Sequence, residues 1–314
     1  FEKRIVIELF ARSSGMREAV GLAERVSSTD ANVLITGETG AGKDLLASFI
    51  HSKSRRATQP FVKIDCATLP SDLLEAELFG YERGAFTGAI EAKAGRFEAA
   101  QKGTIVLDEI AHLSNDAQAK LLRVIETREF ERLGGRKTIK LDARLIALTN
   151  VDLETAVKGG RFREDLFYRL NVINIRVPPL RERKDDLSKL IQHFLRHYAA
   201  KHGRNTQRVS PEALAVLQAY NYPGNARELA NIIERAVIVA TGKRLEENDL
   251  PDGLKAAVSA QQRKQKPQSL AQLEAAYIAE MLSATGGNKA ECARILGISR
   301  KNLYEKIARY QLTS

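Results

Sequence analysis

Short apolar runs alternate with amphipathic segments between residues 17 and 178. The amphipathic segments, such as residues 43–51 and 117–126, carry apolar positions at helical spacing. The apolar runs are rich in β-branched residues and lack polar alternation, which is typical of strands buried on both faces of a parallel sheet. The predicted strands are residues 31–38, 61–66, 104–109, 144–150 and 172–177. This alternation predicts a doubly wound α/β domain.

The strand pattern stops after residue 178, and helical spacing takes over. Residues 187–199, 211–219 and 227–240 predict a small all-helical domain. Residues 255–268 are polar and basic, so we expect a flexible linker there, followed by a last helical segment. The predicted parts are an N-terminal linker remnant (1–13), an α/β domain (14–178), a helical domain (179–254), a linker (255–268) and a C-terminal domain (269–314).

Composition narrows the class of protein only slightly. Lys and Arg number 49 against 39 Asp and Glu, and the net charge of +10 suits a nucleic-acid partner or a basic enzyme. Cys66 and Cys292 form no metal-spaced pair, which favours a reducing, cytoplasmic setting. No apolar run reaches the ~20 residues that span a bilayer, so we expect no membrane partner. The chain begins at Phe1, and we expect its regulatory input to come from a missing N-terminal part or from a separate protein.

The segment GETGAGKD follows the first predicted strand and opens a helix. The spacing of Gly37, Gly42 and Lys43 is that of a P-loop, in which backbone amides surround phosphates and the lysine reaches the β- and γ-phosphates. Asp44 stands where a serine or threonine is usual. The residues expected to bind the nucleotide in this loop are Gly37, Glu38, Thr39, Gly40, Ala41, Gly42, Lys43 and Asp44.

Two carboxylates, Asp108 and Glu109, end a predicted strand at the sheet edge that carries the P-loop. We expect Asp108 to hold Mg²⁺ through water and Glu109 to polarise the attacking water. General-base assistance contributes about 10²–10⁴ in rate, so cationic help on the γ-phosphate is also expected. Spacing does not choose among the candidate cations, which are Arg161, Arg163, Arg169 and Arg227.

A glycine-rich stretch, RGAFTGAIE at residues 83–91, is a poor helix or strand. It places Phe86 between Gly84 and Gly88. The stretch is either a turn whose phenylalanine lies in the core or a flexible finger that presents an aromatic tip to a partner. Its own residues do not decide between the two.

The C-terminal stretch NKAECARILGISRKNLYEKIARYQL predicts a helix–turn–helix. Asn288 can cap one helix, Gly297 suits a left-handed exit, and Ser299 can cap the next helix, whose Leu303 and Ile307 face inward. From residue 255 onward there are ten Lys and Arg against four Asp and Glu, although a basic interaction module would share this excess. The residues expected to contact DNA are Ser299, Arg300, Lys301, Asn302, Glu305, Lys306 and Arg309.

Four segments together resemble the bacterial enhancer-binding proteins, which are AAA+ ATPases that activate sigma-54 RNA polymerase. The resemblance runs from about Ser14 to Leu254, and a Fis-like tail extends it to the end of the chain. The hexapeptide GAFTGA is close to diagnostic of this family, whereas a P-loop alone is not. The segments are ELFGYERGAFTGA, FREDLFYRLNV, PPLRER and YPGNAREL.

The resemblance implies a role for each matching residue. An acidic residue after the P-loop lysine is usual in the family, and Asp108 and Glu109 match its Walker B motif. Thr149 and Asn150 match sensor I, and Arg227 matches sensor II. Two arginines match those offered to the nucleotide of a neighbouring subunit, so a homo-oligomer, usually a hexameric ring built from dimers, is implied. These arginines are Arg163 and Arg169.

The resemblance also implies the partners and cofactors. ATP and Mg²⁺ are the cofactors, and the partners are the sigma-54 RNA polymerase holoenzyme and double-stranded enhancer DNA, in a two-component regulatory system. A DNA-bound AAA+ repressor or architectural regulator that does not engage sigma-54 is the alternative, and a clamp-loader or protease-associated ring is a third. The sigma-54 contacts would be Gly84, Ala85, Phe86, Thr87, Gly88 and Ala89.

Two positions depart from the family pattern. Asp65 stands where the family usually has an asparagine, and an ionised Asp65 would repel Glu109. His112 stands where an acid is common, and we expect it to be a surface residue.

Overall fold

The computed structural model describes residues 11–265 and 270–312. The first ten residues of the predicted linker remnant and residues 266–269, at the predicted junction with the C-terminal domain, therefore lie outside the description. The chain divides into two compact units, Phe1–Leu254 and Lys255–Ser314. No described helix has both the length and the apolar character that crossing a membrane requires.

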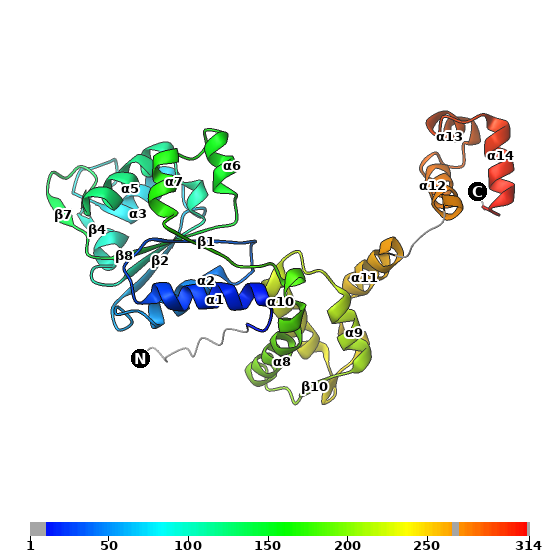
Figure 1. Ribbon diagram of the computed structural model, residues 1–314, viewed down its shortest axis with the longest axis horizontal. Helices are drawn as coiled ribbons and strands as arrows, with labels where there is room; N and C mark the ends of the chain where they lie inside the picture. Colours follow the sequence, from blue (N-terminus) through cyan, green and yellow to red (C-terminus); the bar gives the residue numbers. More distant parts are fainter. Residues whose placement is uncertain (1–10, 266–269, 313–314) are drawn as a thin grey trace. The chain divides into compact units, whose positions relative to one another are not determined.

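A parallel five-stranded sheet forms the centre of the first unit (Figure 1). The five predicted strands are confirmed, and they lie in the order β2-β5-β8-β1-β9. Every neighbouring pair in this sheet is parallel. The strands are β1 (Val33–Thr36), β2 (Phe61–Asp65), β5 (Thr104–Asp108), β8 (Arg144–Thr149) and β9 (Ile173–Arg176).

Helices cover both faces of the sheet, as the doubly wound prediction requires. Alternate strand residues point to opposite faces, so Ile105 and Leu107 pack into one hydrophobic cluster while Val106 packs into the other. One face carries α1 (Ser14–Ser27) and α2 (Lys43–Ser52). The other carries α3 (Ser71–Phe79), α4 (Arg96–Ala99), α5 (Asn115–Thr127), α6 (Leu153–Lys158) and α7 (Glu164–Leu170), with the short helix η1 (Ile110–His112) beside β5.

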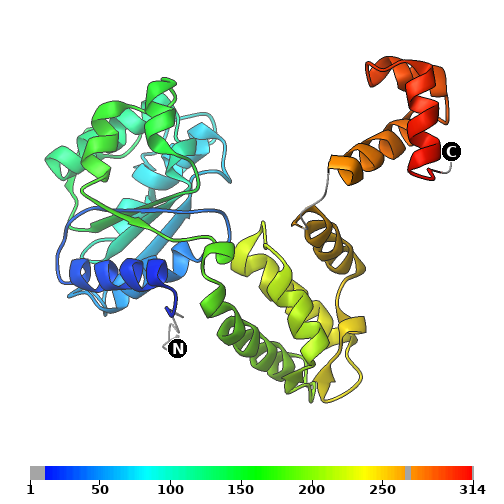
Figure 2. The same ribbon diagram turned by 45° about the vertical axis from the view of Figure 1, so that its right-hand side comes forward.

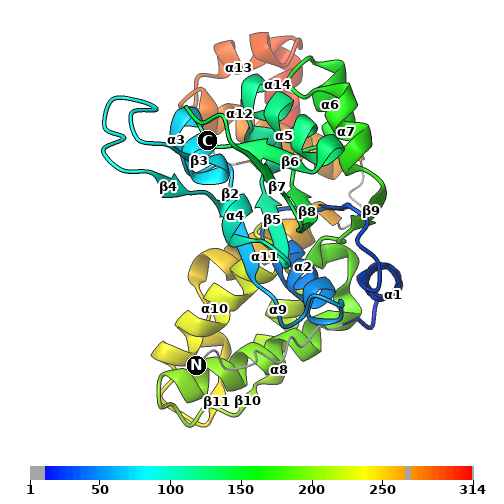
Figure 3. The same cartoon turned by 90° about the vertical axis from the view of Figure 1, so that its left-hand side faces the viewer.

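Two small antiparallel pairs, which the sequence analysis did not predict, extend from the α/β domain. One pairs β3 (Gly80–Tyr81) with β4 (Lys93–Ala94), and the other pairs β6 (Glu129–Glu131) with β7 (Thr138–Lys140). The first pair brackets the glycine-rich stretch, which Figure 3 shows as a loop projecting from the side of the domain. Both pairs have only two or three residues per strand, too few to give a period-two signal.

The predicted all-helical domain is present, and we call it the lid. Helices α8 and α10 lie side by side (green and yellow in Figure 2). A buried carboxylate ties the lid to the start of α1, because Asp186 accepts hydrogen bonds from the backbone N–H of Arg12 and from the hydroxyl of Ser13. The lid elements are η2 (Leu180–Glu182), α8 (Lys184–Lys201), α9 (Pro211–Ala219), α10 (Asn225–Val239), η3 (Glu247–Asp249) and the paired strands β10 (Arg208–Val209) and β11 (Arg244–Leu245).

The predicted flexible linker is wrong over most of its length, because α11 (Asp252–Gln265) is helical there. Its residues are mainly Ala, Lys, Gln and Arg, which are strong helix formers. Polarity was therefore a poor guide to chain flexibility at this point.

The second unit contains the predicted helix–turn–helix. Its helices α12 (Leu270–Ala284), α13 (Lys289–Ile295) and α14 (Arg300–Arg309) surround a small cluster that includes Leu303, which is fully buried. The predicted caps are confirmed: Asn288 accepts from two backbone N–H groups of α13, and Ser299 accepts from Asn302. Gly297 has the expected left-handed conformation, with φ of 66°.

Candidate nucleotide, partner and DNA sites

The P-loop connects β1 to the first turn of α2. Gly40 has a φ of 75°, and a Cβ added there would come within 2.4 Å of the Gly224 carbonyl oxygen in the lid. Only glycine permits both the left-handed backbone and this close approach. The loop is therefore shaped by the lid as well as by its own sequence.

Carbonyl groups of the P-loop itself hold Lys43 inside the loop. Its ammonium donates hydrogen bonds to the carbonyl oxygens of Gly37 at 2.8 Å and Glu38 at 3.3 Å. Burial of the side chain lowers the pKa of Lys43, and the nearby Glu109 carboxylate, 4.0 Å away, partly offsets that effect. The ammonium is thus positioned for an anion at the N-terminus of α2.

Glu109 occupies an unfavourable backbone conformation at the end of β5. Its φ is 53°, a left-handed value that costs a residue with a side chain about 1–2 kcal/mol. The carboxylate accepts a hydrogen bond from the backbone N–H of Asn150 at 3.3 Å, and the Asn150 amide donates to the Thr39 hydroxyl at 2.9 Å. The residues matched to Walker A, Walker B and sensor I therefore meet at one edge of the sheet.

Thr149, the other residue matched to sensor I, does not lie at the exposed sheet edge with Asn150. It is fully buried, and its hydroxyl accepts a hydrogen bond from the backbone N–H of Val151 at 3.0 Å. Thr149 shapes the turn that presents Asn150.

Asp108 contacts a cation that the sequence analysis missed. Oδ2 of Asp108 lies 2.8 Å from Nζ of Lys63, which also bonds the carboxylate of Asp44. Burial opposes the charge on Lys63, but the hydrogen bonds to the two carboxylates outweigh it and raise the pKa of the ammonium. The sequence alone could not show this contact, because it depends on the register in which β2 pairs with β5. That register places Lys63 opposite Val106, two residues before Asp108.

Asp65 and His112, the two departures from the family pattern, are neighbours of Asp108 and Glu109: Asp65 is paired with Asp108 across β2 and β5, and the backbone N–H of His112 donates to the Glu109 carbonyl at 3.0 Å. The Asp65 carboxylate accepts from the backbone N–H of Ala67 at 2.9 Å, and within the described part of the chain it makes no hydrogen bond with Glu109. The expected repulsion between these two carboxylates stays a prediction. His112 is exposed, as expected.

The lid contributes a second set of contacts to the P-loop. Arg181 donates to the Glu38 carboxylate at 2.6 and 2.8 Å, and the Asn225 amide donates to it at 3.0 Å. These hydrogen bonds, with Arg181 the larger cause, lower the pKa of Glu38 to about 2. Arg183 donates to the Ala41 carbonyl at 2.6 Å. These lid residues lie in the segments PPLRER and YPGNAREL, but no role was predicted for them, because nothing local in the sequence links them to the P-loop.

A cavity of about 250 Å³ lies between the P-loop, the end of β5 and the lid. Arg227 lines it, which places the sensor II candidate at the same cavity as Lys43. The other predicted site residues that line it are Thr39, Gly40, Gly42, Asp44, Asp108 and Glu109.

Arg163 and Arg169 lie on the exposed surface around α7. Arg163 pairs with Asp165 at 2.8 Å, and Arg169 pairs with Glu126 at 3.1 Å. Neither arginine lines the cavity of its own chain.

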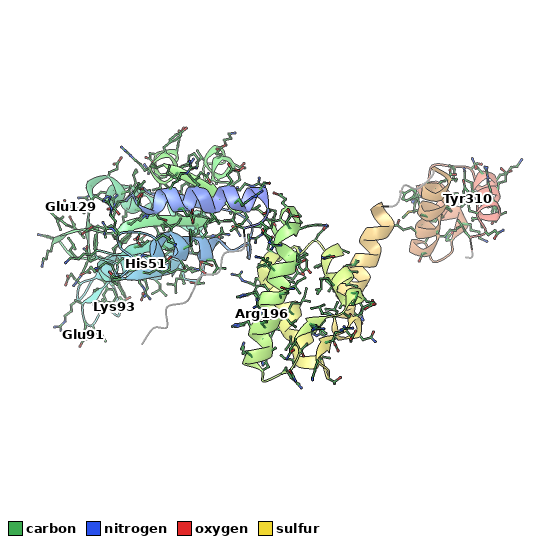
Figure 4. The ribbon with its side chains drawn as sticks, turned by 60° about the horizontal axis from the view of Figure 1, so that its bottom comes forward. His51, Glu91, Lys93, Glu129, Arg196 and Tyr310 are labelled. Atoms are coloured by element: carbon green, nitrogen blue, oxygen red, sulfur yellow. The ribbon has the colours of Figure 1, made fainter. Side chains whose placement is uncertain are left out.

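The glycine-rich stretch forms a closed loop whose phenylalanine is outside the core. The backbone N–H of Gly84 donates to the Ala89 carbonyl at 2.8 Å. Phe86 is 41% exposed, and its ring packs edge-on against Tyr81 with centroids 5.0 Å apart. Ile90, which the sequence analysis did not single out, is 78% exposed. In Figure 4, Glu91 and Lys93 mark the end of this loop, at the far end of the α/β domain from Arg196 of the lid.

Six of the seven predicted DNA contacts are exposed, five of them on α14 and one, Ser299, at its N-cap. Lys306 differs, because it is half-buried and pairs with Glu274 of α12 at 2.7 Å. The phenol of Tyr310 donates to the same carboxylate at 2.6 Å. Lys306 therefore holds α14 against α12. The exposed residues are Ser299, Arg300, Lys301, Asn302, Glu305 and Arg309.

Comparison with known proteins identifies three family models along the chain. They are described as the Sigma-54 interaction domain over residues 9–176, an AAA+ ATPase lid domain over residues 181–267, and the Fis family of bacterial regulatory proteins over residues 269–310. The lid model thus covers much of the segment that was expected to be a linker.

Individual relatives match almost the whole chain. It is 45% identical over 310 residues to Regulatory protein AtoC of Escherichia coli strain K12, covering 96% of this chain and 67% of that protein. It is 43% identical over 325 residues to Transcriptional regulatory protein FlbD of Caulobacter vibrioides, covering 98% and 70%. The structure of NtrX from Brucella abortus in complex with ATP matches with a TM-score of 0.72 and 36% identity, covering 96% of this chain and 69% of that one.

Proposed function

The chain belongs to the sigma-54-dependent transcription activators, and from this premise we propose how its residues couple ATP hydrolysis to transcription. It is an AAA+ ATPase with a sigma-54 interaction domain and a Fis-type DNA-binding domain. The proposal is that a homo-oligomeric ring, bound to double-stranded enhancer DNA, hydrolyses Mg²⁺–ATP. The ring would use residues 84–89 to remodel the closed sigma-54 polymerase.

The observation that carries the catalytic part is the meeting of Lys43, Glu109 and Asn150 beside the lid cavity. Lys43 lies 4.0 Å from the Glu109 carboxylate. A γ-phosphate entering the loop would attract the ammonium and leave Glu109 free to orient a water molecule for attack. Asn150 is hydrogen-bonded to the Thr39 hydroxyl and to Glu109, so a bound phosphate that shifts either group would also shift Asn150 at the end of β8.

The metal part rests on the donor set. Asp108 and Asp44 supply carboxylate oxygens beside the P-loop, the ligand type that Mg²⁺ uses together with nucleotide phosphates and water. Asp108 and Asp44 would hold the ion, which when bound neutralises charge on the phosphates. The same two residues bond Lys63, so both carboxylates already face one cation position.

The ring part rests on the surface arginines. Arg163 and Arg169 are exposed and have weak, solvated ion-pair partners that a neighbouring phosphate could replace. An arginine that acts in trans supplies transition-state charge that the isolated chain lacks. The nucleotide pocket of a monomer would then lack this arginine, and assembly would be needed for turnover.

Transcription in vitro tests the proposed function as a whole. Sigma-54 and sigma-70 holoenzymes are compared with ATP and with a non-hydrolysable analogue, and Lys43→Ala serves as the variant that cannot bind phosphates. Activation of the sigma-54 enzyme alone, dependent on hydrolysis and on Lys43, is the expected result. DNA binding that represses, or that has no effect with either holoenzyme, would overturn the proposal in favour of a regulator that does not engage sigma-54.

A further inference from the structure

Lys63 already engages the carboxylates to which the proposed function assigns Mg²⁺, and the inference therefore rests on that function. Its ammonium lies 2.8 Å from Oδ2 of Asp108 and also bonds Oδ1 of Asp44. The other oxygen of Asp108, Oδ1, accepts a hydrogen bond from the backbone N–H of Glu109 at 3.0 Å. Both oxygens of Asp108 are therefore engaged by donors of the protein itself.

The position of Lys63 in the sheet lets its ammonium leave. β2 is the edge strand beside β5, and the Lys63 side chain is 38% exposed. Lysine carries a compact charge on a flexible four-carbon stem, so it can move from a carboxylate to solvent without a change in the backbone. The side chain can therefore leave the carboxylates by rotation about its own bonds.

We propose that Lys63 is a resident counter-ion of the metal site: it holds Asp44 and Asp108 together without Mg²⁺ and withdraws when Mg²⁺ binds. Mg²⁺ requires oxygen ligands in near-octahedral geometry at about 2.0–2.1 Å, which an ammonium group cannot supply. Two cations sharing one carboxylate would lie within a few ångströms and repel each other. The metal therefore competes with Lys63, and binds more weakly than the carboxylates alone would allow.

A purely supporting role for Lys63 predicts the opposite sign. If the ammonium only kept the two carboxylates in place for the metal, its removal would disorder them and weaken Mg²⁺ binding. The direction of the change in metal affinity thus separates competition from support, independently of the hydrolysis rate.

The test compares Lys63→Met with wild type by calorimetric titration of ADP in EDTA and at several Mg²⁺ concentrations, and by Mn²⁺ titration followed by electron paramagnetic resonance. Competition predicts that Lys63→Met binds Mn²⁺ about tenfold more tightly, roughly 1.4 kcal/mol, and that Mg²⁺ strengthens its ADP binding by a correspondingly larger factor.

Two variants serve as matched controls. Lys63→Arg keeps a cation and should stay near wild type, whereas Lys93→Met removes a lysine that pairs with Glu77 elsewhere in the same domain. Thermal melting confirms that each variant is folded.

Unchanged or weaker Mn²⁺ binding in folded Lys63→Met would overturn the inference and leave the proposed function intact. A wild-type protein that binds and hydrolyses ATP equally well in EDTA would instead refute the metal part of the proposed function.

Discussion

Truncation of Phe86 to alanine distinguishes two roles for the glycine-rich loop: contact with a partner and support of the core. Phe86 is 41% exposed, and its ring packs against that of Tyr81 with centroids 5.0 Å apart. Phe97 in the same domain is fully buried and lies between Phe79 at 5.4 Å and Phe130 at 5.6 Å. Phe97→Ala is therefore a matched control for the loss of a phenyl ring.

The two variants should differ clearly in stability. Loss of the Phe86 ring forfeits the edge-on pair, about 0.5–1.5 kcal/mol, and part of the roughly 1.5–3 kcal/mol that full burial of a phenylalanine provides, whereas truncation of a core phenylalanine costs about 3–5 kcal/mol. One kcal/mol shifts the Tm of a domain of this size by roughly 2–4 °C. Phe86→Ala should thus lower Tm by a few degrees, and Phe97→Ala by roughly 6–20 °C on the same scale.

Calorimetry, phosphate release and a sigma-54 gel shift with ADP–aluminium fluoride together measure the outcome. Phe86→Ala should keep ring formation and hydrolysis while losing sigma-54 binding, because in the proposed function sigma-54 would cover the exposed part of the Phe86 ring. Phe97→Ala should lose stability and hydrolysis together. A Tm for Phe86→Ala as low as that of Phe97→Ala, or sigma-54 binding at wild-type affinity, would refute the reasoning.

The remaining predictions concern catalysis, assembly and DNA. Glu109→Gln should bind ATP but stop hydrolysis, and wild-type phosphate release would remove Glu109 from its role. Rings made only of Arg169→Ala subunits should not hydrolyse ATP, and mixing with Glu109→Gln subunits should restore part of the activity. Mixed rings, confirmed by light scattering, that stay inactive would argue against action in trans. Leu303→Ala should cost about 2–5 kcal/mol, enough to unfold the small C-terminal unit and abolish DNA binding while ATPase activity persists. Lys301→Ala should cost about 1–3 kcal/mol on specific DNA if it reads a base, whereas equal weakening on all sequences would assign it to phosphate.

Local patterns in the sequence were enough to predict the elements and motifs whose stabilising contacts are made by neighbouring residues in the chain. The parallel strands are continuous apolar runs because helices bury both of their faces, and the P-loop spacing follows from the glycines that its turn needs. The caps at Asn288 and Ser299 bond only the first turn of their own helices, so side-chain chemistry alone predicts them.

Contacts between distant segments could not be predicted in this way. Lys63 reaches Asp108 only because β2 and β5 pair in one register, and Arg181 reaches Glu38 only because the lid folds over the P-loop. The segment after Leu254 was misjudged for a different reason, since its polarity was given more weight than its helix propensity. The ion pair of Lys306 with Glu274 on a neighbouring helix could likewise not be predicted from the helical repeat, and the contact of Lys306 with DNA stays a prediction.

The hydrogen bonds between the lid and the P-loop mean that the first unit cannot be divided without damaging its own phosphate pocket. Asn225 is fully buried and bonds both the Glu38 carboxylate and the Thr39 carbonyl, and Arg183 bonds the Ala41 carbonyl. A chain cut at the boundary between the α/β domain and the lid would leave these acceptors without their donors. Heating should therefore melt both regions in one cooperative transition, and nucleotide that protects the loop should delay proteolysis of α10 as much as that of α2.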